Sequence, residues 1–290
     1  MQGSDTAAPF VVMRSHNDMP VVAETLARLH EQDHAFQLLC LDNESEDGTV
    51  EELRKYTDRI VNIPRGKYVP GRVLNLGMEL STSDHVVFLN SDCTPIDSQW
   101  LRNLMSGFSG DERVAAVFGR QVPRSDCYPL FAKDAEDTYG DGSRQKYWRH
   151  CFSMASSAIS RLPWKSQRFN ENLSYSEDIE WTWRVRQTGF LIRYVPDSVV
   201  MHSHNYSLKQ FYRRHYGEGR AEAAIFSWTA WERGLLRYSF LPCTRQILSD
   251  WKYFVGKGLW GSVIHSPLFR VAQMLGRRRG FRVGLKEKAQ

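Results

Sequence analysis

The sequence near the N-terminus reads Phe10-Val11-Val12-Met13-Arg14-Ser15-His16-Asn17-Asp18, a short apolar run that ends in a polar turn. Four apolar residues in a row predict a buried strand. Pro20 then opens a helical pattern, and Asn17 or Asp18 is placed to cap that helix. A buried strand that leads into a helix is the repeating unit of an α/β sheet.

The same unit recurs along the first 120 residues. Residues 37–41 form an apolar run that ends at Asp42, and residues 86–89 form another that ends at Asn90-Ser91-Asp92. Helical patterns separate these runs, which predicts a doubly wound, mostly parallel, Rossmann-like sheet. Ligands bind such sheets outside the carboxyl ends of the strands, where Ser15, Asp42 and Asn90 all fall.

Charge divides the chain into two parts. The 290 residues carry a net charge of +5, but residues 209–290 hold 16 Lys and Arg against 5 Asp and Glu. We therefore expect an α/β domain over 1–208 and a basic, aromatic, helical region over 209–290. Within the first domain we expect two halves, over about residues 10–120 and 121–208.

Composition also limits the class of protein. Hydrophobic residues at 42% and aromatic residues at 12% exclude a disordered chain. No apolar run reaches the roughly 18–20 residues of a spanning helix, and the start lacks the pattern of a signal peptide. Five scattered cysteines without CxxC spacing favour a reducing compartment, so we expect a cytoplasmic protein.

Three short segments carry candidate chemistry. Asp92 follows a buried strand, so it either binds a divalent cation or is a simple turn residue. Asp178 lies where a helix begins, where the helix dipole favours the ionised form that a general base needs; the alternative is an ordinary preference for acids at that end. His202 and His204 follow a later strand and share a face, as metal ligands or as structural histidines. The small residues 153–158 either approach a ligand or form a core strand.

Along the chain, Asp42 and Asp92 follow strands, Asp178 lies where a helix begins, and His202 comes last. This order resembles the family 2 glycosyltransferases of the GT-A fold over about residues 10–220. Residues 12–17 are similar to the first strand of the family with its PTYN end. Residues 42–49 resemble its DNGSTDGT segment, and residues 71–77 resemble its ARNxG region. Residues 194–214 are similar to rhamnosyltransferase-type members that build polysaccharides.

The resemblance implies that residues 10–120 are the nucleotide-binding half and residues 121–208 the acceptor and catalytic half, and it implies a set of nucleotide-binding residues. Asp42 would accept the imide N–H of uracil or thymine, with Ser15 and His16 holding the base from the first strand. Arg72 would face the diphosphate through charge-assisted hydrogen bonds. The complete set implied for the nucleotide is Ser15, His16, Asp42, Arg72, Asn75, Ser91 and Asp92.

The resemblance also implies a metal site and a base. Asp92 matches the second acid of the DxD motif and would bind Mg²⁺ or Mn²⁺. Asn90 stands in place of the first acid, so one carboxylate remains, and His202 or His204 would serve as a further ligand. Asp178 matches the base of the ED motif and would take the proton of the acceptor hydroxyl.

The implied activity is inverting transfer of a sugar from a UDP- or dTDP-linked donor to a glycan or lipid-linked acceptor, in cell-surface polysaccharide synthesis. Two alternatives belong to other classes. A nucleotidyltransferase usually has a Gly-rich loop after the first strand, which residues 14–18 lack. A non-catalytic nucleotide-sugar-binding protein would not need both Asp92 and Asp178. No nucleic-acid fingerprint accompanies the basic tail.

The tail predicts a peripheral contact with an anionic membrane, at the inner face of the plasma membrane. Aromatic residues among cations suit the headgroup region, and Arg277-Arg278-Arg279 is the sharpest basic element. The alternative is that the aromatics pack as helices and leave only the charges exposed. The aromatic residues concerned are Trp228, Trp231, Tyr238, Phe240, Trp251, Tyr253, Phe254, Trp260 and Phe269.

Overall fold

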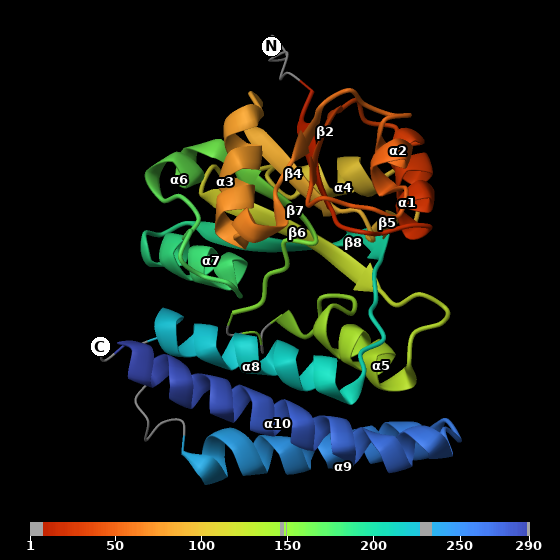
Figure 1. Ribbon diagram of the computed structural model, residues 1–290, viewed down its shortest axis with the longest axis vertical. Coiled ribbons are helices and arrows are strands. Elements are labelled where there is room, and N and C mark those ends of the chain that lie inside the picture. The colour runs from red at the N-terminus through yellow and green to blue at the C-terminus, as the bar shows by residue number, and fades with distance from the viewer. Residues whose placement is uncertain (1–7, 146–147, 149, 227–233, 289–290) are drawn as a thin grey trace. The chain divides into compact units, whose positions relative to one another are not determined.

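The computed structural model describes residues 8–145, 148, 150–226 and 234–288, which form two compact units (Figure 1). The first unit contains Met1–Arg124, Ala135–Asn172 and Glu177–Ser203. The second contains Ser125–Asp134, Leu173–Ser176 and His204–Gln290. The second unit thus takes two short segments from the middle of the chain, in addition to the C-terminal region that the sequence separates by charge.

The first unit is built on an eight-stranded sheet in the order β3-β2-β1-β4-β7-β6-β8-β5. Strands β1 to β4 run parallel, and β7 runs antiparallel to both of its neighbours, β4 and β6. The mostly parallel sheet is therefore confirmed. The strands are β1 (Phe10–Ser15), β2 (Gln37–Asp42), β3 (Ile60–Asn62), β4 (His85–Asn90), β5 (Thr94–Pro95), β6 (Val114–Val122), β7 (Ser156–Ser160) and β8 (Leu191–Met201).

Helices cover both faces of this sheet, because successive residues of a strand point to opposite sides. Val12 and Phe88 pack with α3, α6 and α7, whereas Val11 and Val87 pack with α1, α2 and α4 (Figure 1). The two-sided core explains why the strands are continuous apolar runs. The helices are α1 (Val21–His30), α2 (Thr49–Leu53), α3 (Pro70–Leu80), α4 (Trp100–Ser106), α6 (Arg161–Ser166) and α7 (Glu177–Gln187); α5 (Pro129–Thr138) follows β6.

The start of α1 differs from the prediction that Asn17 or Asp18 caps it. No side chain caps this helix. The carboxylate of Asp18 accepts hydrogen bonds from the backbone N–H of His16 at 2.8 Å and from the hydroxyl of Ser91. Asp18 is therefore held toward the end of β4, and the cap prediction was wrong.

Four helical elements make up most of the second unit: α8 (Leu208–Ile225), the π-helical turn η3 (Leu235–Phe240), α9 (Leu241–Gly256) and α10 (Trp260–Lys288). Gly276, Gly280 and Gly284 of α10 face the backbone carbonyl oxygens of α8, and a Cβ atom at any of them would overlap with that backbone. Glycine at every fourth position therefore permits the close approach of the two helices. No described helix combines the length and the apolar composition that crossing a bilayer requires.

Candidate active site

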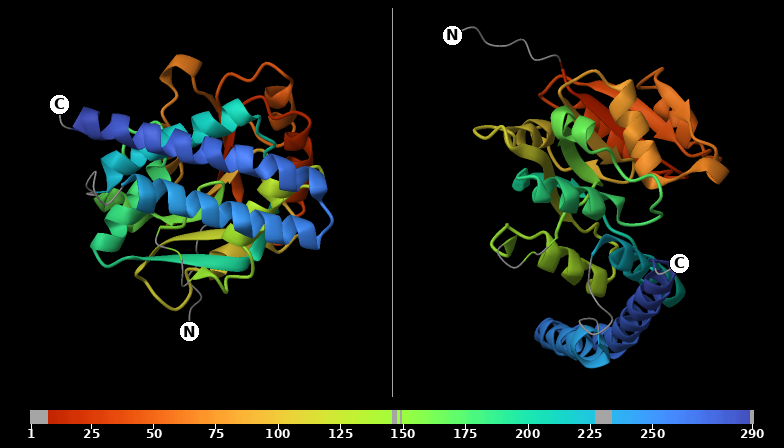
Figure 2. Two further views of the ribbon diagram at one scale, coloured as in Figure 1. Left: turned by 90° about the horizontal axis from the view of Figure 1, so that it is seen from below. Right: turned by 90° about the vertical axis from the view of Figure 1, so that its left-hand side faces the viewer.

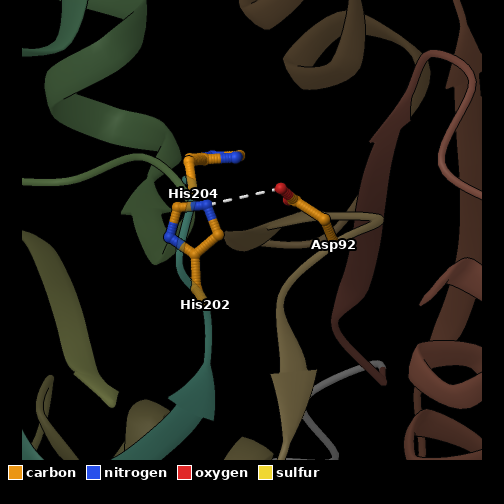
Figure 3. Close-up of side chains that lie close together, drawn as sticks. All are labelled: Asp92, His202 and His204. Carbon is orange, nitrogen blue, oxygen red and sulfur yellow. Dashed lines mark ion pairs between the residues drawn. The ribbon is translucent and has the colours of Figure 1, made fainter. Parts of the chain in front are cut away.

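The ends of β4 and β8 bring Asp92 and His202 together, as the sequence predicts. His202 Nε2 lies 3.4 Å from Asp92 Oδ2, and both side chains are partly buried (Figure 3). His204 follows two residues later, where the first unit ends. One ligand atom of each of the three residues lies within 4.8 Å of the others. An imidazole beside a carboxylate is a donor set that divalent transition-metal ions accept.

Gln121 of β6 decides which nitrogen of His202 faces Asp92. Its amide oxygen lies 2.7 Å from His202 Nδ1, and its amide nitrogen donates to the Ser153 hydroxyl at 2.8 Å. A carbonyl oxygen only accepts, so Nδ1 donates to Gln121 in this arrangement and Nε2 is the nitrogen that faces Asp92. The residues therefore fit a divalent cation, with Gln121 as the group that orients the imidazole.

Asp178 lies in the first turn of α7 and is partly buried. Its Oδ1 accepts from its neighbour Ile179 N–H at 2.8 Å, and its Oδ2 accepts from Met154 N–H at 3.3 Å. Burial raises the pKa of Asp178 above its ordinary value, although these hydrogen bonds and the charge of Arg14 oppose the rise. The expectation that the helix start keeps this carboxylate readily ionised was therefore incomplete, because burial is the larger effect.

Arg14 of β1 gives a physical reason for the asparagine at position 90. Its Nη2 donates to Asn90 Oδ1 at 2.7 Å, while its buried Nε makes no hydrogen bond within the described part of the chain. The amide of Asn90 accepts this hydrogen bond and, being neutral, leaves the positive charge of Arg14 unpaired by Asn90. The charge of Arg14 accordingly lowers the pKa of both Glu177 and Asp178, against the effect of burial.

Residues 153–155, directly before β7, connect the two halves of the site. Ser153 bonds Gln121, Met154 bonds Asp178, and the Ala155 carbonyl accepts from Asn90 N–H at 2.9 Å. Strand β7 itself is buried between β4 and β6. The sequence left open whether this segment approaches a ligand or forms a core strand, and residues 156–160 form a core strand. Residues 153–155, which we call the brace, connect the candidate metal ligands with the candidate base.

Asp42 ends β2 beside a cavity of about 790 Å³. Both of its oxygens accept hydrogen bonds, Oδ1 from the hydroxyls of Ser15 and Ser45 and Oδ2 from Ser45 N–H. A carboxylate has about four acceptor positions, so Oδ2 retains capacity for a further donor. The residues that line the cavity are Asp42, Glu44, Ser45, Glu46, Val50, Arg54, Asp58, Ile60, Asn62 and Arg65.

Four other predicted residues have structural partners. Asn75 is buried, with its amide bonded to Trp164 Nε1, to Glu171 and to the backbone at Phe169. Asn75 was expected in the nucleotide-binding set, but both polar atoms of its amide bond the 164–171 segment. Arg72 is half-exposed and pairs with Glu171 at 3.5 Å. Ser91 is buried and donates to Asp18, and His16 Nδ1 lies 2.7 Å from the Asn43 carbonyl.

The sheet that carries the site matches a known protein family. Residues 10–164, which include β1 to β7, match the family model described as Glycosyl transferase family 2. The chain belongs to glycosyl transferase family 2.

Two curated members of the family are similar to this chain. The O-antigen chain rhamnosyltransferase WbaN of Salmonella anatum is 30% identical over 224 residues, which are 69% of this chain and 70% of that protein. The O-antigen chain rhamnosyltransferase RfbN of Salmonella typhimurium is 27% identical over 200 residues, which are 63% and 62% of the two chains. The chain is thus a glycosyltransferase with rhamnosyltransferase-type relatives.

Solved structures share the GT-A fold. The mannosyltransferase PcManGT of Pyrobaculum calidifontis, in complex with GDP-Man and Mn²⁺, has a TM-score of 0.66 at 16% identity and covers 99% of this chain and 91% of its own. Glucosyl-3-phosphoglycerate synthase of Mycobacterium tuberculosis, with Mg²⁺ and UDP, has a TM-score of 0.53 at 16% identity, over 75% and 79% of the two chains. The predicted fold class is therefore confirmed.

Two residues of this family 2 glycosyltransferase site were not predicted from the sequence. Asp18 is a second carboxylate close enough to Asp92 for the two charges to interact, which helps to raise the Asp18 pKa, although burial is the larger cause. Arg124 donates to the backbone carbonyl of Asp92 at 3.2 Å and to the Thr94 hydroxyl at 2.6 Å. The only sequence signal for either was a polar residue just beyond a strand end.

Proposed function

We propose that this glycosyltransferase moves a sugar from a UDP- or dTDP-linked donor to a hydroxyl of a glycan or lipid-linked saccharide, with inversion, in cell-surface polysaccharide synthesis. The observation that carries the proposal is the brace at 153–155, which ties the Asp92–His202 pair to Asp178. The names of the O-antigen relatives support a polysaccharide product.

Asp178 is the general base in this proposal. Its carboxylate takes the proton of the acceptor hydroxyl as that oxygen bonds to the anomeric carbon. The bond between that carbon and the diphosphate oxygen breaks on the opposite side, so the anomeric configuration inverts and the nucleoside diphosphate leaves. Because burial raises the pKa of Asp178, it is a better proton acceptor than an exposed aspartate.

Asp92 and His202 would hold Mg²⁺ or Mn²⁺, with His204 as a third ligand. When bound, the ion neutralises the diphosphate of the donor and favours its departure. Gln121 keeps Nε2 of His202 directed at the ion, and Arg124 holds the backbone of Asp92 in place. Asp42, at the cavity beside β2, accepts from the imide N–H of the base, which uracil and thymine carry and cytosine lacks.

The donor class is tested by a screen of UDP-, dTDP- and GDP-sugars with Mn²⁺ or Mg²⁺, by donor hydrolysis and thermal shift. The proposal expects hydrolysis and a higher melting temperature with a UDP- or dTDP-sugar. A preference for GDP-sugars would overturn the proposed donor class.

The metal is tested by EDTA and by Asp92→Ala, with Asp197→Ala as control because Asp197 is an exposed acid of β8. EDTA should abolish activity, and Asp92→Ala should weaken donor binding and remove stimulation by the metal. Full activity of the wild type in EDTA would contradict a metal-dependent transferase.

A further inference from the structure

The helices α9 and α10 of the second unit carry an unusual amount of exposed apolar surface. They lie side by side, as the left view of Figure 2 shows. Nine large apolar side chains on them are between 39 and 71% exposed. They are Leu241, Leu248, Trp251 and Val255 of α9, and Trp260, Ile264, Leu268, Val271 and Leu275 of α10.

Their spacing makes two stripes. In each helix the exposed apolar residues recur at three-, four- or seven-residue intervals, so they lie on one side of the helix. The buried residues Phe254 of α9 and Phe281 of α10 occupy the other side. We call these two stripes together the outer face of α9 and α10.

Basic residues extend the α10 stripe toward the C-terminus and lie beside the α9 stripe. Beyond Leu275, the α10 stripe continues with three exposed basic residues at positions 279, 282 and 286, which are four, seven and eleven residues further along. Arg279 also bonds the side chain of Tyr212. On α9, Arg245 and Lys252 each follow a stripe leucine by one helical turn and are exposed.

Acidic residues do not balance these cations. Residues 241–288 contain two acids, Asp250 and Glu287. Asp250 is fully buried, and Glu287 pairs with Arg220 of α8 at 2.7 Å. The outer face is therefore apolar at its centre and cationic at its margins.

We propose that the outer face of α9 and α10 binds the surface of an anionic lipid bilayer, with both helices lying in the plane of the interface. Apolar side chains of such helices enter the boundary between headgroups and acyl chains, while Lys and Arg meet anionic headgroups. A second copy of this chain fits less well, because a two-fold contact between these faces would bring cations together without acids to pair them.

The location of this surface differs from the sequence-based expectation. Arg277 of the Arg277-Arg278-Arg279 segment pairs with Glu222 inside the unit, and Arg278 reaches Ser239 at 3.4 Å. Among the predicted aromatics, Phe254 is buried, and Tyr253 and Phe269 pack with it. Trp228 and Trp231 lie outside the described residues. Of the predicted aromatics, Trp251 and Trp260 do lie on the outer face, and leucines, valines and an isoleucine of α9 and α10 form the rest of it.

Co-sedimentation of the full chain with vesicles tests the inference, using phosphatidylcholine alone or with one quarter phosphatidylglycerol. The wild type should bind the anionic vesicles at least tenfold more strongly, and salt should weaken this binding. Equal binding to both vesicle types, or binding to neither, would overturn the proposal.

Two variants separate the apolar and the cationic contributions. Leu248→Ser/Ile264→Ser/Leu268→Ser and Arg245→Gln/Lys252→Gln/Arg282→Gln/Lys286→Gln should each reduce binding at least tenfold. Leu162→Ser is the matched apolar control, since Leu162 of the first unit is 72% exposed and Ile264 is 71% exposed. A control that reduces binding as much as either variant would contradict a specific face.

The inference does not depend on the donor or on the acceptor, but it would place the enzyme where a lipid-linked acceptor lies. Donor hydrolysis without vesicles, measured on the same samples, keeps the two proposals distinguishable. An active enzyme that does not bind vesicles overturns the membrane inference alone. A dimer that the triple serine variant converts to a monomer, without vesicle binding by the wild type, would instead make this face a protein interface.

Discussion

Each of the two units buries a group of charged side chains, and the two groups are built differently. In the second unit, Arg270 bonds Asp250 at 2.7 Å and Asp134 at 2.6 Å, and Lys133 adds a contact to Asp250 at 3.2 Å. We call these four residues the Asp250 ion cluster. In the first unit, Glu177 is buried and Asp178 is partly buried, yet neither forms an ion pair among the described residues.

The difference separates a structural role from a chemical one. In the Asp250 ion cluster two cations face two acids, so every charge has an opposite partner and the group joins α5, α9 and α10. At Glu177 and Asp178 burial exceeds the compensation from Arg14, and both pKa values rise. Buried acids that are incompletely compensated are typical of sites that move protons.

The largest expected effect is on catalysis. Asp178→Asn removes the proton acceptor and should reduce kcat by about 10²–10⁴-fold, with little change in donor binding. Asp197→Asn, at an exposed acid of β8, is the control. Steady-state kinetics with a saturating donor measure both variants, and a kcat above about a tenth of wild type would show that Asp178 is not the base.

Removal of one member of the Asp250 ion cluster should destabilise the second unit. Asp250→Ala leaves Arg270 and Lys133 buried near each other with less compensation, which costs about 3–5 kcal/mol of unfolding free energy. Arg245→Gln, at an exposed cation of the same helix, should change little. Chemical denaturation measures both, and a loss no larger than that of the control would mean that the cluster adds no stability.

Substitution of Gln121 should weaken the affinity of the site for a divalent metal ion. Gln121→Met keeps the size of the side chain but removes the acceptor for His202 Nδ1, so Mn²⁺ affinity should fall about 10–100-fold. The measurement is a Mn²⁺ titration of donor hydrolysis, with the exposed Gln99→Met as control. Unchanged Mn²⁺ affinity would contradict the orienting role of Gln121.

Arg14 should have the smallest effect, seen in the pH profile. The base must be deprotonated, so activity falls as the pH drops below the raised pKa of Asp178. Arg14→Met removes a charge that lowers this pKa, so the acid limb of kcat should move to higher pH, and Arg14→Lys should restore most of the shift. If the acid limb of the kcat profile lies at the same pH in Arg14→Met as in the wild type, Arg14 does not lower the pKa of Asp178.

Sequence reasoning predicted the parts of the site that lie at strand ends. Apolar runs fixed β1, β2 and β4, and the polar residues after them include Asp42 and Asp92. His202 followed in the same way from the end of β8. These residues could be predicted because the carboxyl ends of parallel strands meet at one edge of the sheet.

Pairings between distant segments could not be predicted. Arg14 and Asn90 are 76 residues apart, and Gln121 and His202 are 81 apart. Nothing local marks either pair, so Asn90 was interpreted as a lost metal ligand and Gln121 was not considered. The burial of Asp178 depends on packing in the same way, which is why the helix start alone did not predict its raised pKa.

We propose that the partial burial of Asp178 serves proton transfer at a cost to stability. Folding raises the pKa of Asp178 above its ordinary value of 3.8. The free energy of unfolding therefore falls as the pH rises from 3.8 through the raised pKa, because the folded protein then holds more protons than the unfolded protein. The most direct measurement is the unfolding free energy of wild type and Asp178→Asn from pH 4 to pH 8. We predict that the stability of the variant relative to wild type increases with pH across this range. A difference that is constant with pH, or that shifts in favour of the wild type as the pH rises, would contradict the claim.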